Sequence, residues 1–275
     1  MSVAAAVGDG DVVTIDAAIA RMEAMQGELE AAAPDGLEWF NGLYTKVTTA
    51  VRVGLQAGEY VDDGFIHDLD VAFANRYFDA VRAWESDPRF APRSWAVLLD
   101  ARWRHGIMPV QYAAAGVNAH INYDLAQALV TTWNEYGHRH VTGDSQWADY
   151  QMITGIFDDK YQEFRSDVLK PEFEKRFDKG RMARAADLSS HVVVNETRQL
   201  AWVNGRVLWD LQVAHSWGIV SDRRPDYVEW VLDRQTATAG KLMLVDLGDA
   251  PAGAPPEGSA PAATAPAAAV EVEDD

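Results

Sequence analysis

The stretch that decides the fold runs from Val110 to Trp133 and reads VQYAAAGVNAHINYDLAQALVTTW. Asp124 is the only fixed charge in it. A run this long with apolar or small residues on all sides is typical of a helix that is buried over most of its circumference. The carboxylate and the low leucine content argue against a membrane span. The sequence therefore predicts an all-α, single-domain bundle of about seven or eight helices around a buried central helix at 110–133.

Two polar pairs interrupt the apolar character of this helix. His120 and Asp124 are four residues apart, so they share one helix face, and Asn118 and Asn122 form a second pair on a neighbouring stripe. A buried carboxylate requires a cation, a metal ion or several hydrogen-bond donors, because leaving it unpaired costs several kcal/mol. We therefore expect an interior polar site in which His120 and Asp124 are catalytic or bind metal and Asn118 and Asn122 contact substrate.

A helix expected at 37–56 carries a hydrogen-bonding stripe that includes Asn41 and Tyr44. One interpretation is that these side chains are satisfied inside a helical bundle. The other is that they point into the same pocket as His120, with Asn41 contacting substrate and Tyr44 taking part in catalysis. The stripe by itself is compatible with both interpretations.

The helix expected at about 65–84 has a single charge, Asp70, on its apolar face. Asp70 is expected either to join the site as a third metal ligand or to pair with a buried arginine, with Arg76 and Arg198 as the candidates. Arg198 itself shares a stripe with several tryptophans on a helix expected at 187–217. It is therefore either packed by cation–π contacts, or the counter-ion of a buried Asp within a substrate-binding site.

Composition excludes several classes of function. The chain has 42 Asp and Glu against 24 Lys and Arg, a net charge of −18, which disfavours nucleic acid and anionic membranes as partners. It has no cysteine, so disulfides and thiolate metal sites are excluded. The chain contains neither a Walker sequence nor a GxGxxG motif after a strand, so no nucleotide cofactor is indicated. The expected partner is a small-molecule substrate with an apolar portion.

The chain divides into three segments by composition. We expect a disordered lead at 1–13, a helical domain at 14–247 and a disordered Pro, Ala and acidic tail at 248–275. The first residues lack the basic and apolar regions of a signal peptide, so cytoplasmic residence is expected. The preference for arginine over lysine and the many alanines suggest a bacterial source. Oligomeric state is left open.

Four segments together resemble a bacterial and fungal family, the domain of unknown function 5995. They are NGLYTKVT at 41–48, DVAFANRYFDA at 70–80, GVNAHINYDLAQAL at 116–129 and RQLAW at 198–202. The resemblance spans roughly residues 36–245, and the NAHINYDL block is its most specific part. The family name implies no activity.

A second resemblance concerns chemistry. The spacing Gly116-xxx-His120-xxx-Asp124 is similar to the GxxxHxxxD helix of the zinc-dependent phospholipase C and single-strand nuclease superfamily, whose members are all-helical. The likeness implies that His120 and Asp124 bind metal, with Asp70 as a third ligand, and such ligands suit zinc, iron or manganese. The chain departs from the superfamily where PxH usually follows, because Ala128 and Val130 occupy those positions.

Three functions remain open from the sequence. The first is a metal-dependent enzyme, of hydrolase or lyase type, with its ion between His120, Asp124 and Asp70. The second is a metal-free cyclase or lyase of specialised metabolism that uses His and Asp as acid–base groups in an aromatic pocket. The third is a non-enzymatic binding protein for an apolar ligand, in which the polar groups serve only the structure.

Overall fold

The computed structural model describes residues 3–32, 34–134, 144–169, 179–190, 194–221 and 223–247. No strand occurs among them, which confirms the all-α class and the single domain, and none of the described helices is both long and apolar enough to cross a membrane. The described helices outnumber the seven or eight expected. An additional short helix lies near the start of the chain, and the central helix is divided into three elements. In chain order the elements are α1 (Val3–Val7), α2 (Ile15–Ala31), α3 (Leu37–Ala57), α4 (Asp63–Ser86), the 3-10 turn η1 (Pro88–Phe90), α5 (Arg93–Leu99), α6 (Pro109–Ala119), the π-helical turn η2 (His120–Asp124), α7 (Leu125–Asn134), α8 (Asp144–Val168), α10 (Lys179–Ser190), α11 (Val194–Ser216) and α12 (Arg223–Met243).

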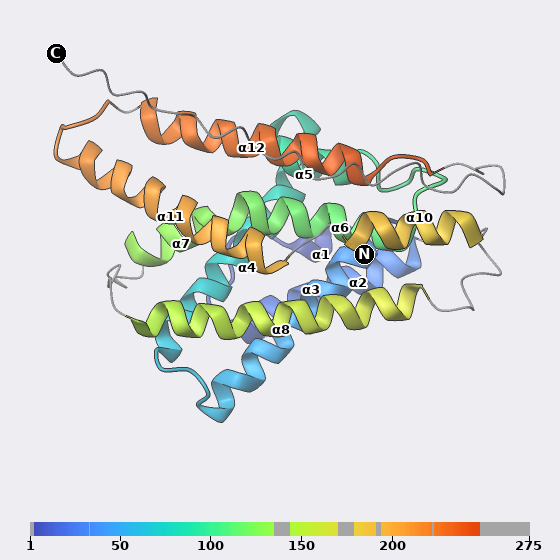
Figure 1. Ribbon diagram of the computed structural model, residues 1–275, viewed down its shortest axis with the longest axis horizontal. Coiled ribbons are helices and arrows are strands. Elements are labelled where there is room, and N and C mark those ends of the chain that lie inside the picture. Colours follow the sequence, from blue (N-terminus) through green and yellow to red (C-terminus); the bar gives the residue numbers. More distant parts are fainter. Residues whose placement is uncertain are drawn as a thin grey trace, which may run out of the picture.

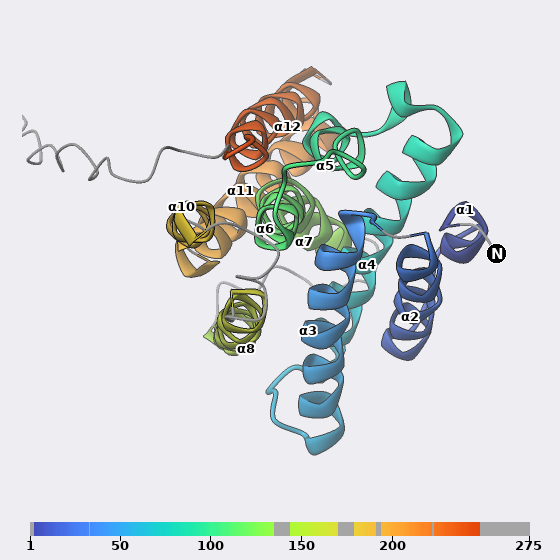
Figure 2. The same ribbon diagram turned by 90° about the vertical axis from the view of Figure 1, so that its right-hand side faces the viewer.

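The central helix is formed by α6, η2 and α7, and the other helices surround it (Figure 1). Every residue of α6 is buried. Viewed end-on, α6 and α7 lie in the middle, with α3 and α4 on one side, α8, α10 and α11 on the other, and α5 and α12 along a third (Figure 2). The short α1 and the longer α2 form an outer layer against α3 and α4. The apolar run at 110–133 is therefore the core of the bundle, as its composition predicts.

Local signals in the sequence set several helix ends. The side chain of Thr14 accepts a hydrogen bond from the backbone N–H of Ala17 and begins α2, and Asp62 caps α4 in the same way. Gly58, in the left-handed conformation with a φ of 66°, ends α3. Pro109 occupies the first turn of α6, where its missing N–H has no cost.

Small residues in α6 let α3 approach closely. A methyl group added at Gly116 would lie 2.4–2.6 Å from atoms of the Phe40 side chain, a separation that no Cβ tolerates without movement of the ring. Phe40 is fully buried between neighbouring aromatic rings, so it has little freedom to move. The close contact of α3 with the central helix therefore depends on this glycine.

We expect Gly116→Ala to lower the free energy of unfolding by about 1–3 kcal/mol, because overpacking outweighs the better helix propensity of alanine. Urea denaturation measures the change. The matched control is Gly155→Ala in α8, where a new methyl group meets nothing within 4 Å and should stabilise by about 0.5–1 kcal/mol. Equal effects of the two substitutions would contradict the packing account.

The first residues of the chain and one helix differ from expectation. Residues 3–13 are not a disordered lead: α1 forms there, and Val7 and Val12 are buried. Asn75 of α4 exchanges two hydrogen bonds with the backbone of Val12, which fastens this segment to the bundle. The single helix expected at 187–217 corresponds to two described elements, α10, which ends at Ser190, and α11, which begins at Val194, and residues 191–193 lie outside the described residues. The tail expected at 248–275 lies outside the described residues.

A buried ion pair, which the sequence did not indicate, ties the segment between α2 and α3 to the segment after α5. Arg102 donates from Nε to both carboxylate oxygens of Asp35, at 2.9 and 2.8 Å, and from Nη1 to Glu85 at 3.0 Å. The Arg102 and Asp35 side chains are each 1% exposed. The guanidinium also lies over the rings of Trp84 and Trp103. The role of this pair is structural.

Candidate functional site

The central helix widens into a π-helical turn at the two residues predicted to be functional. Across η2 the backbone N–H of Leu125 donates to the carbonyl of His120, five residues earlier. Such turns are frequent at functional sites because they re-aim side chains within an otherwise regular helix. His120 Nδ1 lies 2.9 Å from Asp124 Oδ2, so the two side chains meet as their spacing predicts.

Trp95 of α5 holds the same carboxylate from a second direction. Its Nε1–H donates to Asp124 Oδ2 over 2.8 Å, and all three side chains are buried. Burial raises the pKa of Asp124 well above its ordinary value, although the hydrogen bond from Trp95 acts the other way. We assign the proton of the other bond to His120 Nδ1, which leaves a lone pair on His120 Nε2. Asp124 is therefore held by two hydrogen-bond donors and not by a cation. Sequence reasoning missed Trp95, because nothing distinguishes it from the other nine tryptophans.

Aromatic rings enclose His120. Phe73 stacks on the imidazole with ring centroids 3.4 Å apart and an interplanar angle of 6°, and Tyr44 meets it edge-on at 4.4 Å. Phe40 and Trp95 lie within 6 Å. Burial in this surrounding, with a smaller contribution from Arg198, lowers the pKa of His120 well below its ordinary value. His120 is consequently neutral near pH 7.

Tyr44 and Phe73 separate His120 from a small cavity that Asp70 and Arg198 also line. The cavity has a volume of about 10 Å³, enough for one water molecule. The rest of its wall is apolar, formed by Val47, Leu69, Leu125, Ile153 and Phe157. We call Tyr44, Asp70, His120 and Arg198 the interior site.

The two charged groups of the interior site do not form a direct ion pair. Arg198 donates from Nε to Thr154 Oγ1 at 3.0 Å and lies over the Tyr150 ring at 4.5 Å. Asp70 shares the cavity with Arg198 without reaching it. Burial raises the pKa of Asp70 to about 7, because the opposing attraction of Arg198 is weaker than the loss of hydration. Both roles considered for Arg198 therefore apply in part. It is packed by a cation–π contact with Tyr150, and it acts on Asp70 electrostatically.

Asp70 Oδ2 and His120 Nε2 have no hydrogen-bond partner, and Tyr44 Oη has none besides a loose contact with the Thr48 hydroxyl. A buried donor or acceptor without a partner costs about 1–3 kcal/mol, and native proteins contain few of them. Asp70 and Tyr44 line the same cavity, so a bound molecule there could supply missing hydrogen bonds.

The amide residues expected to bind substrate lie elsewhere. Asn41 donates to the Met22 carbonyl and to Gln26 Oε1, and it accepts from the Tyr77 hydroxyl, so its polar atoms connect α2, α3 and α4. Asn118 donates to the Thr236 carbonyl and accepts from Asn122.

Asn118 and Asn122 line a separate cavity of about 290 Å³ that also includes residues of α11 and α12. Asn118 and Asn122 therefore do not line the cavity of Asp70 and Arg198.

The described residues do not bring together the three ligands of the divalent-metal site expected from the sequence. Among the residues that the structure describes, no three His, Asp or Glu side chains lie close enough together to hold a metal ion. His120 Nδ1 and Asp124 Oδ2 are occupied by each other, and Tyr44 and Phe73 stand between His120 and the cavity of Asp70. A metal bound by Asp70, His120 and Asp124 stays a prediction, and the proposed function does not use it.

Comparison with known families decides the identity of the chain at the level of a family. A family model described as "Family of unknown function (DUF5995)" matches residues 15–246. The chain belongs to the DUF5995 family. The match includes every residue of the interior site and begins at the first residue of α2.

Neither the curated proteins nor the solved structures contain a match to this DUF5995 chain. The likeness of its GxxxHxxxD helix to the zinc-dependent phospholipase C and nuclease superfamily gains no support from these comparisons. The chemistry of the interior site therefore has to be argued from the described residues themselves.

Proposed function

We propose that this DUF5995 protein is an enzyme that performs acid–base chemistry of lyase or cyclase type on a small, partly apolar substrate in the interior site. The observation that carries the proposal is the unpartnered Asp70 Oδ2 in the wall of a cavity that Tyr44 and Arg198 also line, with the unpartnered His120 Nε2 in the aromatic cluster next to it. A stable core without a function would satisfy these groups or replace them with apolar ones.

Each polar side chain suits one role in a proton transfer. Asp70, whose pKa burial raises to about 7, is matched to give and take protons at neutral pH. Arg198 keeps its charge and would stabilise negative charge that develops on the substrate. Tyr44, whose pKa burial raises well above 10, stays protonated and would donate a hydrogen bond. His120, held by Asp124, would accept one at Nε2.

The apolar wall sets the class of substrate. Leu69, Phe73 and Phe157 leave room for little more than water, so a substrate must displace side chains as it binds. A molecule of a few carbons with one carbonyl or carboxylate group would place its polar end between Asp70 and Arg198 and its carbon chain against this wall. The wall would exclude bulk water from the proton transfer.

Proton exchange tests the proposal on many candidate substrates at once. We would incubate the protein in D₂O with a panel of ketones, carboxylates and thioesters of up to about eight carbons and follow loss of proton signals by NMR. We expect exchange or turnover of at least one compound, reduced about 10²- to 10⁴-fold by Asp70→Asn and also reduced by Tyr44→Phe. Asp159→Asn, an exposed carboxylate of α8, is the matched control.

Each competing function has its own outcome in this experiment. If a compound binds without chemical change, the protein would be assigned as a binding protein and not as an enzyme. Activity that follows elemental metal content and is lost with a chelator would favour the metal-dependent enzyme. Undiminished activity of Asp70→Asn would overturn the assignment of the interior site.

A further inference from the structure

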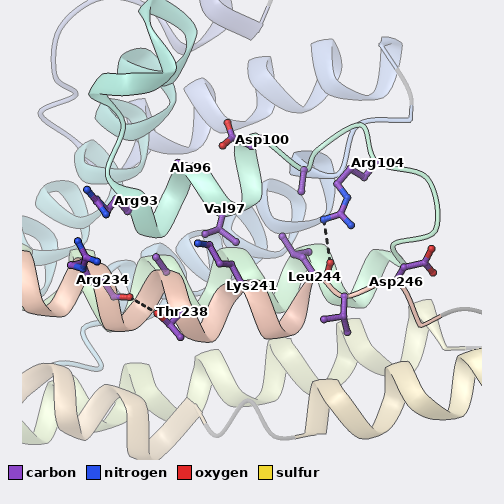
Figure 3. Close-up of a pocket in the computed structure, with 13 residues that line it drawn as sticks. Arg93, Ala96, Val97, Asp100, Arg104, Arg234, Thr238, Lys241, Leu244 and Asp246 are labelled. Atoms are coloured by element: carbon purple, nitrogen blue, oxygen red, sulfur yellow. Dashed lines mark hydrogen bonds between the residues drawn. The ribbon is translucent and has the colours of Figure 1, made fainter.

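A groove with positive charge lies between α5 and α12, on a chain whose net charge is −18. Its volume is about 730 Å³, within the range of small-molecule sites. Arg93 and Arg234 stand at one end, Lys241 near the middle and Arg104 toward the other end (Figure 3). We call this the α5–α12 groove.

Its cations are available to a ligand. In the described part of the chain, Arg93, Arg234 and Lys241 form no ion pair, although Arg234 lies over the Trp230 ring at 4.8 Å. Arg104 makes a long hydrogen bond, 3.4 Å, to the Leu244 carbonyl. All four side chains are exposed. They would therefore attract an anion into the groove, and the attraction would weaken with added salt.

The two acidic residues of the groove already have partners. Asp100 accepts a hydrogen bond from Trp84 Nε1 at 2.8 Å, and Asp246 pairs with Arg181 at 3.1 Å. Asp233, next to the groove, accepts from the backbone N–H groups of Arg93 and Ser94 and so caps α5. Asp100 and Asp233 keep their negative charge, but the cations Arg93, Arg104, Arg234 and Lys241 outnumber these acids, so the balance of charge that faces a ligand is positive.

Between the cations the floor of the groove is apolar. The α5 side chains Ala96 and Val97 face Ala237 and Leu244 across it. Figure 3 shows Val97 and Leu244 between the basic side chains of the two ends. A purely inorganic anion would leave this floor uncovered, whereas an anion with a short hydrocarbon chain would cover both parts.

We propose that the α5–α12 groove binds a phosphate monoester with a short apolar chain. Arg93 and Arg234 at one end of the groove, with Lys241 next along it (Figure 3), favour a doubly charged phosphate over a carboxylate, and arginine side chains match its geometry with paired donors. The groove is separate from the interior site, which lies inside the bundle, so the assignment does not depend on the proposed enzyme activity.

Titration calorimetry of the full chain in a low-salt buffer tests this site with hexyl phosphate as the probe. Binding of hexyl phosphate is expected to be about tenfold or more tighter than that of inorganic phosphate or of hexan-1-ol, each of which offers only one half of the interaction. Lys241→Gln and Arg234→Gln should each weaken hexyl phosphate binding about tenfold. Lys46→Gln on α3, far from the groove in the fold, is the matched control and should leave it unchanged.

Three results would overturn the assignment. They are no heat of binding for hexyl phosphate, equal affinity for inorganic and hexyl phosphate, or equal losses with Lys46→Gln and Lys241→Gln. A membrane headgroup is the other source of this chemistry, so co-sedimentation with vesicles containing phosphatidic acid forms a separate arm. If the protein sediments with the vesicles but does not bind hexyl phosphate, the ligand of the groove would be a lipid headgroup at a membrane surface and the small-molecule assignment would be wrong.

Discussion

Replacing Arg102 with leucine is expected to lower the free energy of unfolding by about 3–5 kcal/mol. The substitution strands Asp35, whose side chain is 1% exposed, without the guanidinium that it contacts through several hydrogen bonds. Asp35 also accepts from the backbone N–H of Leu37 at the start of α3, so the loss extends to this helix end. Urea denaturation followed by circular dichroism measures the effect.

An exposed ion pair of the same chemistry provides the control. Arg89 pairs with Asp87, but its side chain is 85% exposed, so Arg89→Leu should leave stability unchanged within error. The double variant Asp35→Leu with Arg102→Leu should recover part of the loss, because it removes both buried charges together. A loss below about 1 kcal/mol for Arg102→Leu alone would mean that Asp35 finds another partner or reaches water.

The second large expected effect is a gain in the free energy of unfolding. Asp70→Asn should make the protein more stable than the wild type above pH 7, by up to about 4 kcal/mol, while removing the proposed activity. The folded-state pKa of Asp70 is raised to about 7 from an ordinary value of 3.8, so between these values the folded state binds the proton more strongly than the unfolded state. Stability due to this group therefore falls as pH rises from about 4 to about 7, and it is constant above that.

Asparagine resembles the protonated carboxyl group, so the variant should lack this pH dependence. Unfolding measured from pH 4 to pH 8.5 should give equal stability at the acid end and a growing advantage of Asp70→Asn toward neutral pH. Asp159→Asn should follow the wild-type curve. A variant less stable than the wild type at pH 8 would mean that Asp70 is held as an anion by Arg198, which would remove the basis for its role as a proton donor and acceptor.

A gain in stability combined with a loss of activity would identify Asp70 as a residue retained for chemistry and not for folding. Arg102→Leu should give a loss of stability, because Arg102 stabilises the fold and lies outside the interior site. Comparing the two variants thus separates the two kinds of buried charge in the protein.

The sequence alone predicted the elements that depend on local spacing. The apolar run at 110–133 indicated a buried central helix, because a helix that is apolar on all sides and is not a membrane span must be enclosed by other helices. The contact of His120 with Asp124 followed from their separation of four residues, which brings two side chains together within one turn of any helix. The burial of Asp70 and Arg198 followed from their positions on otherwise apolar stripes.

Only the tertiary structure decided which distant residues meet. Trp95 binds Asp124, Arg102 binds Asp35, and Phe73 separates His120 from the cavity beside Asp70. Asn41 looked like a site residue from its stripe, yet its polar atoms join three helices. Periodicity reports which face of a helix is buried, but the partner on that face depends on the crossing angle and axial shift of packed helices, and these arise from the fit of whole side-chain surfaces in three dimensions.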